Sequence, residues 1–216
     1  MKTLIKATSV LALLAATPAF AWEPTKPVEI VVAAGAGGAS DQMARMMQAA
    51  VQKNNLMKQP MIVTLKGAAS GAEALLYMKG SDGDANKVLI AYSLIYMLPL
   101  SAKIPFNWRE LTPVSVIAMD QFVLWDNAEG PKTVKDFIAA AKASSSPFKM
   151  GGTGSKREDH VLTVFMEKKT GAKFSYLPYK SGGEAATQLV GKHTESNVNN
   201  PSENLEVWRS PVAKAL

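Results

Sequence analysis

The chain has 216 residues, a formal net charge of +6 and no cysteine, which excludes disulfide bonds, thiol nucleophiles and iron–sulfur clusters within it. It has only two histidines, His160 and His193, so a zinc site would depend mainly on carboxylates. The lysines and arginines are scattered and form no basic run with interleaved aromatic residues. Nucleic acid is therefore not an expected partner.

The first 21 residues have the pattern of a cleavable secretory signal peptide. Lys2 and Lys6 give a basic start, an apolar run follows at 7–16, and the small residues of Ala19-Phe20-Ala21 form a cleavage signal. The apolar run is too short to cross a bilayer as a helix. We expect cleavage after residue 21 and export of the remaining chain.

The pattern from residue 28 to residue 92 predicts alternating strands and helices. The first strand is an unbroken apolar run, which is typical of a strand buried on both faces of a parallel sheet. Ser40 or Asp41 is expected to cap the helix that follows. The expected elements are a strand at 28–33, a helix ending near 53, a strand at 61–65, a helix at 72–78 and a strand at 88–92. This β-α-β-α-β order predicts a parallel sheet with right-handed crossovers.

The second half repeats this β-α-β plan without repeating the sequence itself. Thr133 is expected to cap its first helix. The expected elements are extended segments at 114–119 and 122–125, a helix ending near 143, a strand at 148–151, a helix at 156–169, a strand at 174–177, a helix at 184–189 and a strand at 195–198. We therefore predict an α/β protein with two lobes, residues 22–123 and 124–216.

Turns of small residues follow several of the predicted strands. They are Gly35-Ala36-Gly37-Gly38-Ala39-Ser40-Asp41, Gly67-Ala68-Ala69-Ser70-Gly71 and Gly152-Thr153-Gly154-Ser155. Small residues let a ligand approach the backbone, and N–H groups at the start of a helix attract a phosphate or a carboxylate. One such turn alone is explained by a tight connection. Several of them in two similar halves favour a clamp for a small anion.

Two other kinds of site fit these turns less well. A nucleotide site is disfavoured because Ser40 stands where G-x-G-x-x-G requires its third glycine, and no turn supplies the G-K-[ST] of a P-loop. A secreted hydrolase remains an alternative, since Ser155 and His160 are about one helical turn apart. The chain has no G-x-S-x-G or H-E-x-x-H motif to support it.

An ordered set of motifs resembles the Bug, or TctC-like, extracytoplasmic solute receptors of tripartite tricarboxylate transporters. The motifs are Pro24-Thr25-Lys26-Pro27-Val28-Glu29-Ile30-Val31-Val32, the turn at 35–41, Lys66-Gly67-Ala68-Ala69-Ser70-Gly71, Leu111-Thr112-Pro113-Val114, Gly152-Thr153-Gly154-Ser155 with His160, and Leu177-Pro178-Tyr179-Lys180-Ser181-Gly182-Gly183. The resemblance implies a type II periplasmic-binding-protein fold, which closes around a ligand like a Venus flytrap. It also implies a non-enzymatic role, no cofactor, a small carboxylate ligand and membrane permease subunits as partners.

The resemblance also implies which residues contact the ligand, mainly through backbone N–H groups and bridging waters. The implied contacts are Ala36, Gly37, Gly38, Ala39, Ser40, Ala68, Ala69, Thr153, Gly154, Ser155 and His160, with Tyr179, Ser181, Gly182 and Asn199 as weaker candidates. Asp41 matches an aspartate of the family motif, and a role as helix cap explains it equally well.

The chain departs from the family in its length and its ending. Members of the family are longer, and the sequence after Arg209 does not resemble them. The resemblance therefore implies an incomplete second lobe with apolar surface left uncovered. A non-functional fragment of a binding protein is the alternative that this departure leaves open.

Overall fold

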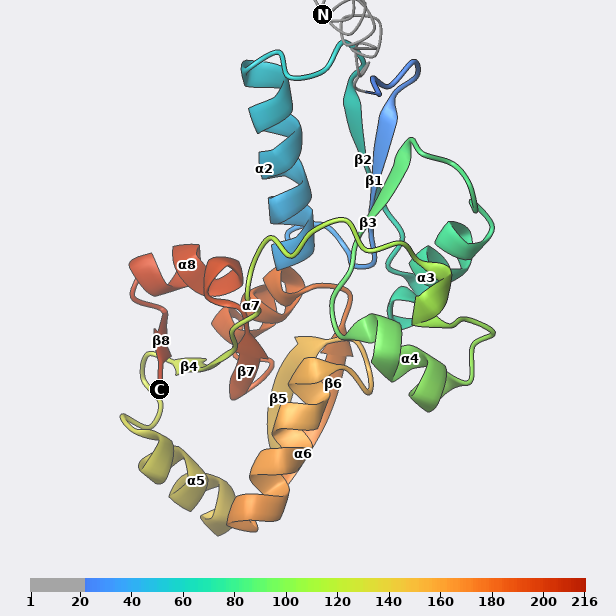
Figure 1. Ribbon diagram of the computed structural model, residues 1–216. Helices are drawn as coiled ribbons and strands as arrows, with labels where there is room; N and C mark the ends of the chain where they lie inside the picture. Colours follow the sequence, from blue (N-terminus) through green and yellow to red (C-terminus); the bar gives the residue numbers. More distant parts are fainter. Residues whose placement is uncertain (1–21) are drawn as a thin grey trace, which may run out of the picture.

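The computed structural model describes residues 22–216, so the predicted signal peptide lies outside the described residues. The chain forms two α/β lobes (Figure 1). In lobe 1, strands β1 (Val28–Val32), β2 (Met61–Leu65) and β3 (Lys87–Ile90) form a parallel sheet in the order β2-β1-β3. The helical segments of this lobe are α2 (Ala39–Lys53), η1 (Ala68–Gly71), α3 (Ala72–Lys79), α4 (Leu94–Ala102) and η2 (Trp108–Glu110).

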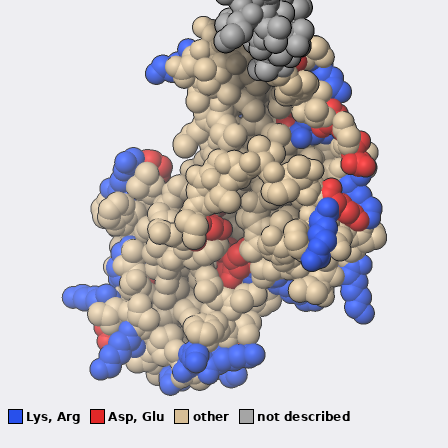
Figure 2. Space-filling model, in the orientation of Figure 1, with Lys and Arg blue, Asp and Glu red and all other residues tan. Residues whose placement is uncertain are grey.

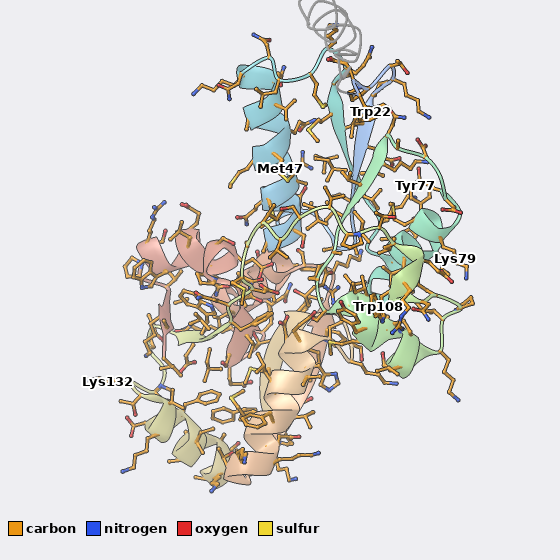
Figure 3. The ribbon with its side chains drawn as sticks, in the orientation of Figure 1. Trp22, Met47, Tyr77, Lys79, Trp108 and Lys132 are labelled. Carbon is orange, nitrogen blue, oxygen red and sulfur yellow. The ribbon has the colours of Figure 1, made fainter. Side chains whose placement is uncertain are left out.

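The core of lobe 1 lies on both faces of β1, as its apolar sequence predicts. Ile30, Val31 and Val32 are completely buried. Alternate residues of the strand point to opposite faces, so Ile30 and Val32 pack toward α2 and Val31 packs toward α3. Met47 of α2 and Tyr77 of α3 reach the sheet from these two sides (Figure 3). The first β-α-β-α-β prediction is thus confirmed.

Lobe 2 contains a five-stranded sheet in the order β6-β5-β7-β4-β8. Its strands are β4 (Val123–Asn127), β5 (Phe148–Thr153), β6 (Phe174–Tyr179), β7 (Ser196–Asn199) and β8 (Ala213–Ala215). Strands β6, β5 and β7 are parallel, as predicted, whereas β4 runs antiparallel to both β7 and β8. The helices are α5 (Val134–Ala143), α6 (Glu158–Thr170), α7 (Gly182–Val190) and α8 (Pro201–Arg209).

Lobe 2 is held together by aromatic packing and by buried amides. The Phe137 ring is completely buried and stacks on Phe174, with ring centroids 5.8 Å apart. The other side of the lobe has a polar interior, because β7 is buried along its length although its sequence is Ser-Asn-Val-Asn. Thr133 caps α5 by accepting a hydrogen bond from the Asp136 N–H, as predicted.

Several elements differ from the sequence-based expectation. The elements α4, α8 and β8 have no counterpart among the expected elements. The helix expected at 184–189 begins two residues earlier, so Gly183 lies in the first turn of α7. The segment at 114–119 was expected to be extended and forms no strand in the described chain. Its Val114, Val116 and Met119 side chains are exposed. An apolar run alone predicts an extended chain, but a strand also needs a partner for its backbone groups.

The helices of the described residues are all too short or too polar to cross a membrane.

Candidate functional site

The predicted small-residue turns meet where the two lobes touch. The carboxyl ends of β1 and β2 and the N-terminus of α2 face lobe 2, and the N-terminus of α7 faces lobe 1 (Figure 1). The Gly35 N–H donates a hydrogen bond of 2.9 Å to the Lys180 carbonyl across this boundary. In lobe 1, this end of a parallel sheet is where ligands of open α/β folds bind.

The turn after β1 brings its glycines close to lobe 2. Gly37 has a φ of +77°, a conformation that favours glycine. A Cβ atom added to Gly183 in α7 would lie 2.9 Å from the Gly37 carbonyl oxygen, so the two backbones approach as closely as glycines allow. Ala36, Ser40 and this pair of glycines therefore lie at the boundary between the lobes.

The predicted cap of α2 is wrong in its detail. Gly38 occupies the N-cap position, and no side chain caps the helix from there. Asp41 lies one turn into the helix, where it is 3% exposed, and its Oδ2 accepts a hydrogen bond of 2.9 Å from the Gly37 N–H. Asp41 thus closes the turn from inside the helix. Because the Asp41 carboxylate accepts a hydrogen bond from this turn, the N-cap position does not need a polar side chain, and glycine can occupy it.

The turn after β2 contains two non-glycine residues in the left-handed region. Ala69 has a φ of 51° and Ser70 a φ of 57°. This conformation directs the Ser70 side chain at lobe 2, where its Oγ accepts a hydrogen bond of 3.2 Å from the Ser155 N–H. The Ala68 N–H donates to Glu73 at 3.3 Å. Left-handed alanine and serine cost about 1 kcal/mol each, so the surrounding structure must stabilise this turn.

The turn after β5 is closed by a buried carboxylate. The Asp159 carboxylate is 4% exposed and accepts a hydrogen bond from the Thr153 N–H. Burial raises the pKa of Asp159 to about 7, although the bond from Thr153 opposes this effect. Gly154, with a φ of +66°, follows at the point where the chain passes Ser70. Thr153, Gly154 and Ser155 therefore lie opposite the lobe 1 turns, as predicted.

The candidates in the second lobe's last turns have structural partners. Ser181 is the N-cap of α7 and accepts a hydrogen bond from the Glu184 N–H. The carbonyl of Tyr179 accepts from the Gly154 N–H at 2.9 Å. Asn199 is completely buried, and its Nδ2 donates to the Gly182 carbonyl at 2.7 Å. These residues shape the site, and direct ligand contact by them stays a prediction.

His160 lies beside the site and is held by lobe 2. Its ring stacks on Tyr176 with the centroids 4.2 Å apart, and its Nδ1 accepts a hydrogen bond from the Lys156 N–H. Burial lowers the pKa of His160, so the ring is neutral at pH 7. Since Nδ1 is an acceptor, the proton of the neutral ring is on Nε2. In this state neither nitrogen is free to take a proton from Ser155.

Two charged residues at the boundary were not found by sequence analysis. Arg157, at the start of α6, is 5% exposed and donates to the Tyr92 hydroxyl of lobe 1. Glu203, in α8, accepts a hydrogen bond of 2.8 Å from the Ala39 N–H of lobe 1. Glu203 had a local signal, because Asn200, Pro201 and Glu203 have the spacing of a capping box with proline at its first helical position.

Acidic side chains accept hydrogen bonds from every one of these turns. Four of them act locally, within the turn and helix to which they belong: Asp41 on Gly37, Glu73 on Ala68, Asp159 on Thr153 and Glu184 on Lys180. Glu203 acts locally on Asn200 and also across the lobes on Ala39. The N–H groups predicted to hold a ligand are thus partly occupied by the protein's own carboxylates. In the part of the chain that the structure describes, no group of three or more His, Cys, Asp or Glu side chains is arranged to hold a metal ion.

Two α/β lobes whose helix N-termini face each other have the architecture of a periplasmic-binding-protein fold. Residues 43–210 match the family described as "Tripartite tricarboxylate transporter family receptor", TctC, and the chain belongs to this family. It is 32% identical over 196 residues to a UPF0065 protein of Cupriavidus necator, covering 88% of this chain and 59% of that protein. It is 30% identical over 203 residues to the protein BugT of Bordetella pertussis, covering 89% of this chain and 60% of BugT.

Solved structures agree with the two-lobed fold. A structure described as a periplasmic transporter matches with a TM-score of 0.80 and 25% identity, covering 89% of this chain and 65% of the other. MatC of Rhodopseudomonas palustris with bound malate matches with a TM-score of 0.78 and 18% identity, covering 89% of this chain and 66% of MatC. Another R. palustris protein, with adipate, matches with a TM-score of 0.76 and 21% identity, covering 89% of this chain and 65% of that chain. The chain spans about three fifths of the length of the curated relatives it matches.

Proposed function

We propose that this chain is the ligand-binding part of a periplasmic receptor that captures a small organic carboxylate for a transporter of the tripartite tricarboxylate type. The observation that carries the proposal is the convergence of small-residue turns from both lobes at one boundary. Gly35 meets Lys180 there, and Ser70 meets Ser155. Family membership supports the receptor role, and the malate and adipate of two structural relatives support the ligand class.

The proposed mechanism is capture by closure of the lobes. N–H groups at the start of α2 and in the turn at 153–155 attract the carboxylate, and closure removes it from water, which strengthens each hydrogen bond. The ligand competes for these groups with the local carboxylates of Asp41 and Asp159 or binds the N–H groups beside them. Release to permease subunits follows when the lobes open. We propose residues 22–123 and 124–216 as the two lobes.

A binding role without catalysis agrees best with the geometry. The hydrolase alternative required His160 to activate Ser155, and the His160 Nδ1 instead accepts from the Lys156 backbone. Membership in a receptor family does not favour the hydrolase alternative either. Export through a cleavable signal peptide remains the proposal made from the sequence, because residues 1–21 lie outside the described part.

Thermal unfolding of the purified chain, from residue 22, tests the proposal. A panel of mono-, di- and tricarboxylates is added, with malate and adipate included. A ligand that binds only the native state raises the melting temperature in proportion to the logarithm of its concentration. We expect at least one carboxylate to do so. A chain with a cooperative melt that no carboxylate shifts would contradict the ligand class, and a chain without a cooperative melt would indicate a fragment that does not fold.

Gly183→Ala tests whether binding requires the close approach of the lobes. The added Cβ would lie 2.9 Å from the Gly37 carbonyl oxygen, so the lobes must move apart. We expect at least a tenfold weaker affinity for the ligand found above, measured by isothermal titration calorimetry, with a melting temperature close to that of the wild type. Gly80→Ala is the matched control, because its Cβ would have no neighbour closer than 3.6 Å. Equal affinities of the two variants would place the ligand elsewhere.

A further inference from the structure

The Glu203 carboxylate lies where the N-termini of three helices meet. It accepts hydrogen bonds from the Ala39 N–H at the start of α2, at 2.8 Å, and from the Asn200 N–H at the start of α8, at 3.1 Å. The Gly182 backbone N–H at the start of α7 lies close enough to this carboxyl group to oppose the rise that burial causes in its pKa. A Cβ atom at Gly182 would overlap this carboxyl group, so the glycine makes room for it. The protein's own carboxylate thus occupies a position suited to an anion.

More carboxylates surround this position from both sides of the boundary. Asp120, in the segment that joins the lobes, accepts a hydrogen bond of 2.6 Å from Asn200 Nδ2. Glu158 accepts a hydrogen bond from the Ser93 hydroxyl of lobe 1, and the buried Asp159 lies next to it in α6. Figure 2 shows acidic side chains in the hollow near the middle of this face, apart from most of the lysines and arginines.

A single guanidinium partly balances these charges. Arg157 lies 4.8 Å from the centre of the Tyr92 ring, and its Nε is 3.6 Å from Glu158. The positive charge of Arg157 therefore already interacts with the Tyr92 ring and the Glu158 carboxylate. Asp120, Glu158, Asp159 and Glu203 outnumber it, and the carboxylates of Asp159 and Glu203 repel each other enough to raise the pKa of Asp159 further. Burial also raises the pKa of Asp120 and of Glu203, so the negative charge of this group of side chains grows as the pH rises.

A polar acceptor in the same corner has no donor. Asn199 is completely buried, and both hydrogen bonds of its side chain are made by Nδ2, to the Gly182 carbonyl and to Asn204 Oδ1. Its Oδ1 has no partner among the described residues. A buried acceptor without a donor is costly, so this corner of the boundary is short of hydrogen-bond donors. The excess of hydrogen-bond acceptors and of negative charge thus favours a ligand group that donates hydrogen bonds and carries a positive charge.

We propose that the cleft selects a zwitterion, with one carboxylate and one ammonium group, over a dicarboxylate of the same length, and that Glu203 imposes this preference. The inference rests on the proposed function. The ligand carboxylate binds the turn N–H groups at 36–40 and 153–155, and the ammonium group lies near Glu203. A second carboxylate at that end would meet the negative charges of Glu203 and Asp120, which repel it.

Matched ligand pairs measure this preference directly. Each pair differs in one end group only: ε-aminocaproate against adipate, and γ-aminobutyrate against succinate. Isothermal titration calorimetry with the purified chain gives the ratio of dissociation constants within each pair. We expect the amino acid of at least one pair to bind the wild type at least tenfold more tightly than its dicarboxylate.

Glu203→Gln identifies the residue responsible. Glutamine keeps the size of the side chain and an oxygen that accepts from Ala39, and it removes the charge. We expect the preference for the amino acid to fall at least fivefold. Glu206→Gln is the matched control, because Glu206 lies on the same helix, is exposed and pairs with Arg209 at 3.1 Å, and it should leave the ratio unchanged. If Glu203→Gln does not fold, Asp120→Asn, at an exposed position, should lower the ratio by about threefold.

The outcomes separate this inference from the proposed function. A wild type that prefers the dicarboxylates, or a ratio that neither Glu203→Gln nor Asp120→Asn changes, overturns the zwitterion proposal and leaves carboxylate capture intact. A folded wild type that binds neither the members of these pairs nor any carboxylate of the thermal panel overturns both. If the control Glu206→Gln changes the ratio as much as Glu203→Gln, the preference does not come from Glu203.

Discussion

The central strands of the two lobes are buried in different ways. In lobe 1, β1 lies between β2 and β3, and its Ile30, Val31 and Val32 fill the space on both faces. In lobe 2, β7 lies between β5 and β4, and its Asn197 and Asn199 are buried just as completely. The difference shows that a central strand of this fold can be buried either by apolar contacts or by amide hydrogen bonds, even though the described amides of β7 leave Asn197 Nδ2 and Asn199 Oδ1 without a partner.

The polar strand makes lobe 2 more sensitive to the loss of a single partner. Asn204 of α8 is completely buried and accepts a hydrogen bond of 2.6 Å from Asn199, while its own amide faces Asn197 at 3.4 Å. A buried amide that loses its partner keeps the full cost of leaving water. An apolar residue that loses one methyl group loses only contacts and a small volume.

Asn204→Ala is expected to have the largest effect. It leaves the amides of Asn197 and Asn199 without their partner, so we expect the free energy of unfolding to fall by about 3 kcal/mol. Ile30→Val in β1 is the comparison, with an expected loss of about 1 kcal/mol. Urea unfolding followed by circular dichroism measures both. Equal losses would show that the amide cluster contributes no more than ordinary packing.

Asp159→Asn is expected to have an intermediate effect that depends on pH. The pKa of Asp159 is about 7 in the folded chain against 3.8 for the free side chain, so the folded state binds the proton more tightly. Stability therefore falls as the pH rises from about 4 to about 7, where the native carboxyl group must ionise while buried. Asparagine keeps an acceptor for Thr153 and does not titrate.

The measurement is the unfolding free energy of both proteins at pH 5 and at pH 8. We expect the variant to gain about 2 kcal/mol relative to the wild type between these two values. Asp126, whose pKa burial raises to about 6, titrates in the same range and is present in both proteins, so the difference isolates Asp159. If the unfolding free energies of the two proteins change equally with pH, ionisation of Asp159 does not destabilise the folded state.

Lys103→Gly in lobe 1 is expected to have the smallest effect and the opposite sign. Lys103 ends α4 with a φ of 52° and a ψ of 36°, a left-handed conformation that glycine adopts without strain. We expect a gain of about 0.5 kcal/mol in the free energy of unfolding. Lys53→Gly, within the regular helix α2, should lose a similar amount. A loss in both variants would show that unfolded-state entropy outweighs the strain at Lys103.

The sequence predicted the parts of the fold that local patterns specify. The apolar run of β1, the small-residue turns and the cap at Thr133 each have a short-range physical cause. Helix α8 was not predicted, although Asn200, Pro201 and Glu203 carry a capping signal. Strand β8 was not predicted because it has only three residues. Arg157 was missed because its burial depends on Tyr92, a residue of the other lobe. No local pattern reports such a contact.

The contact between Ala39 and Glu203 has a consequence for the order of folding. The sheet of lobe 1 closes with residues 28–90 alone, so its formation does not depend on lobe 2. The acceptor for the first N–H of α2 is 164 residues further along the chain. During synthesis that acceptor is made long after α2, so lobe 1 can assemble first and α2 obtains this hydrogen bond when the lobes dock.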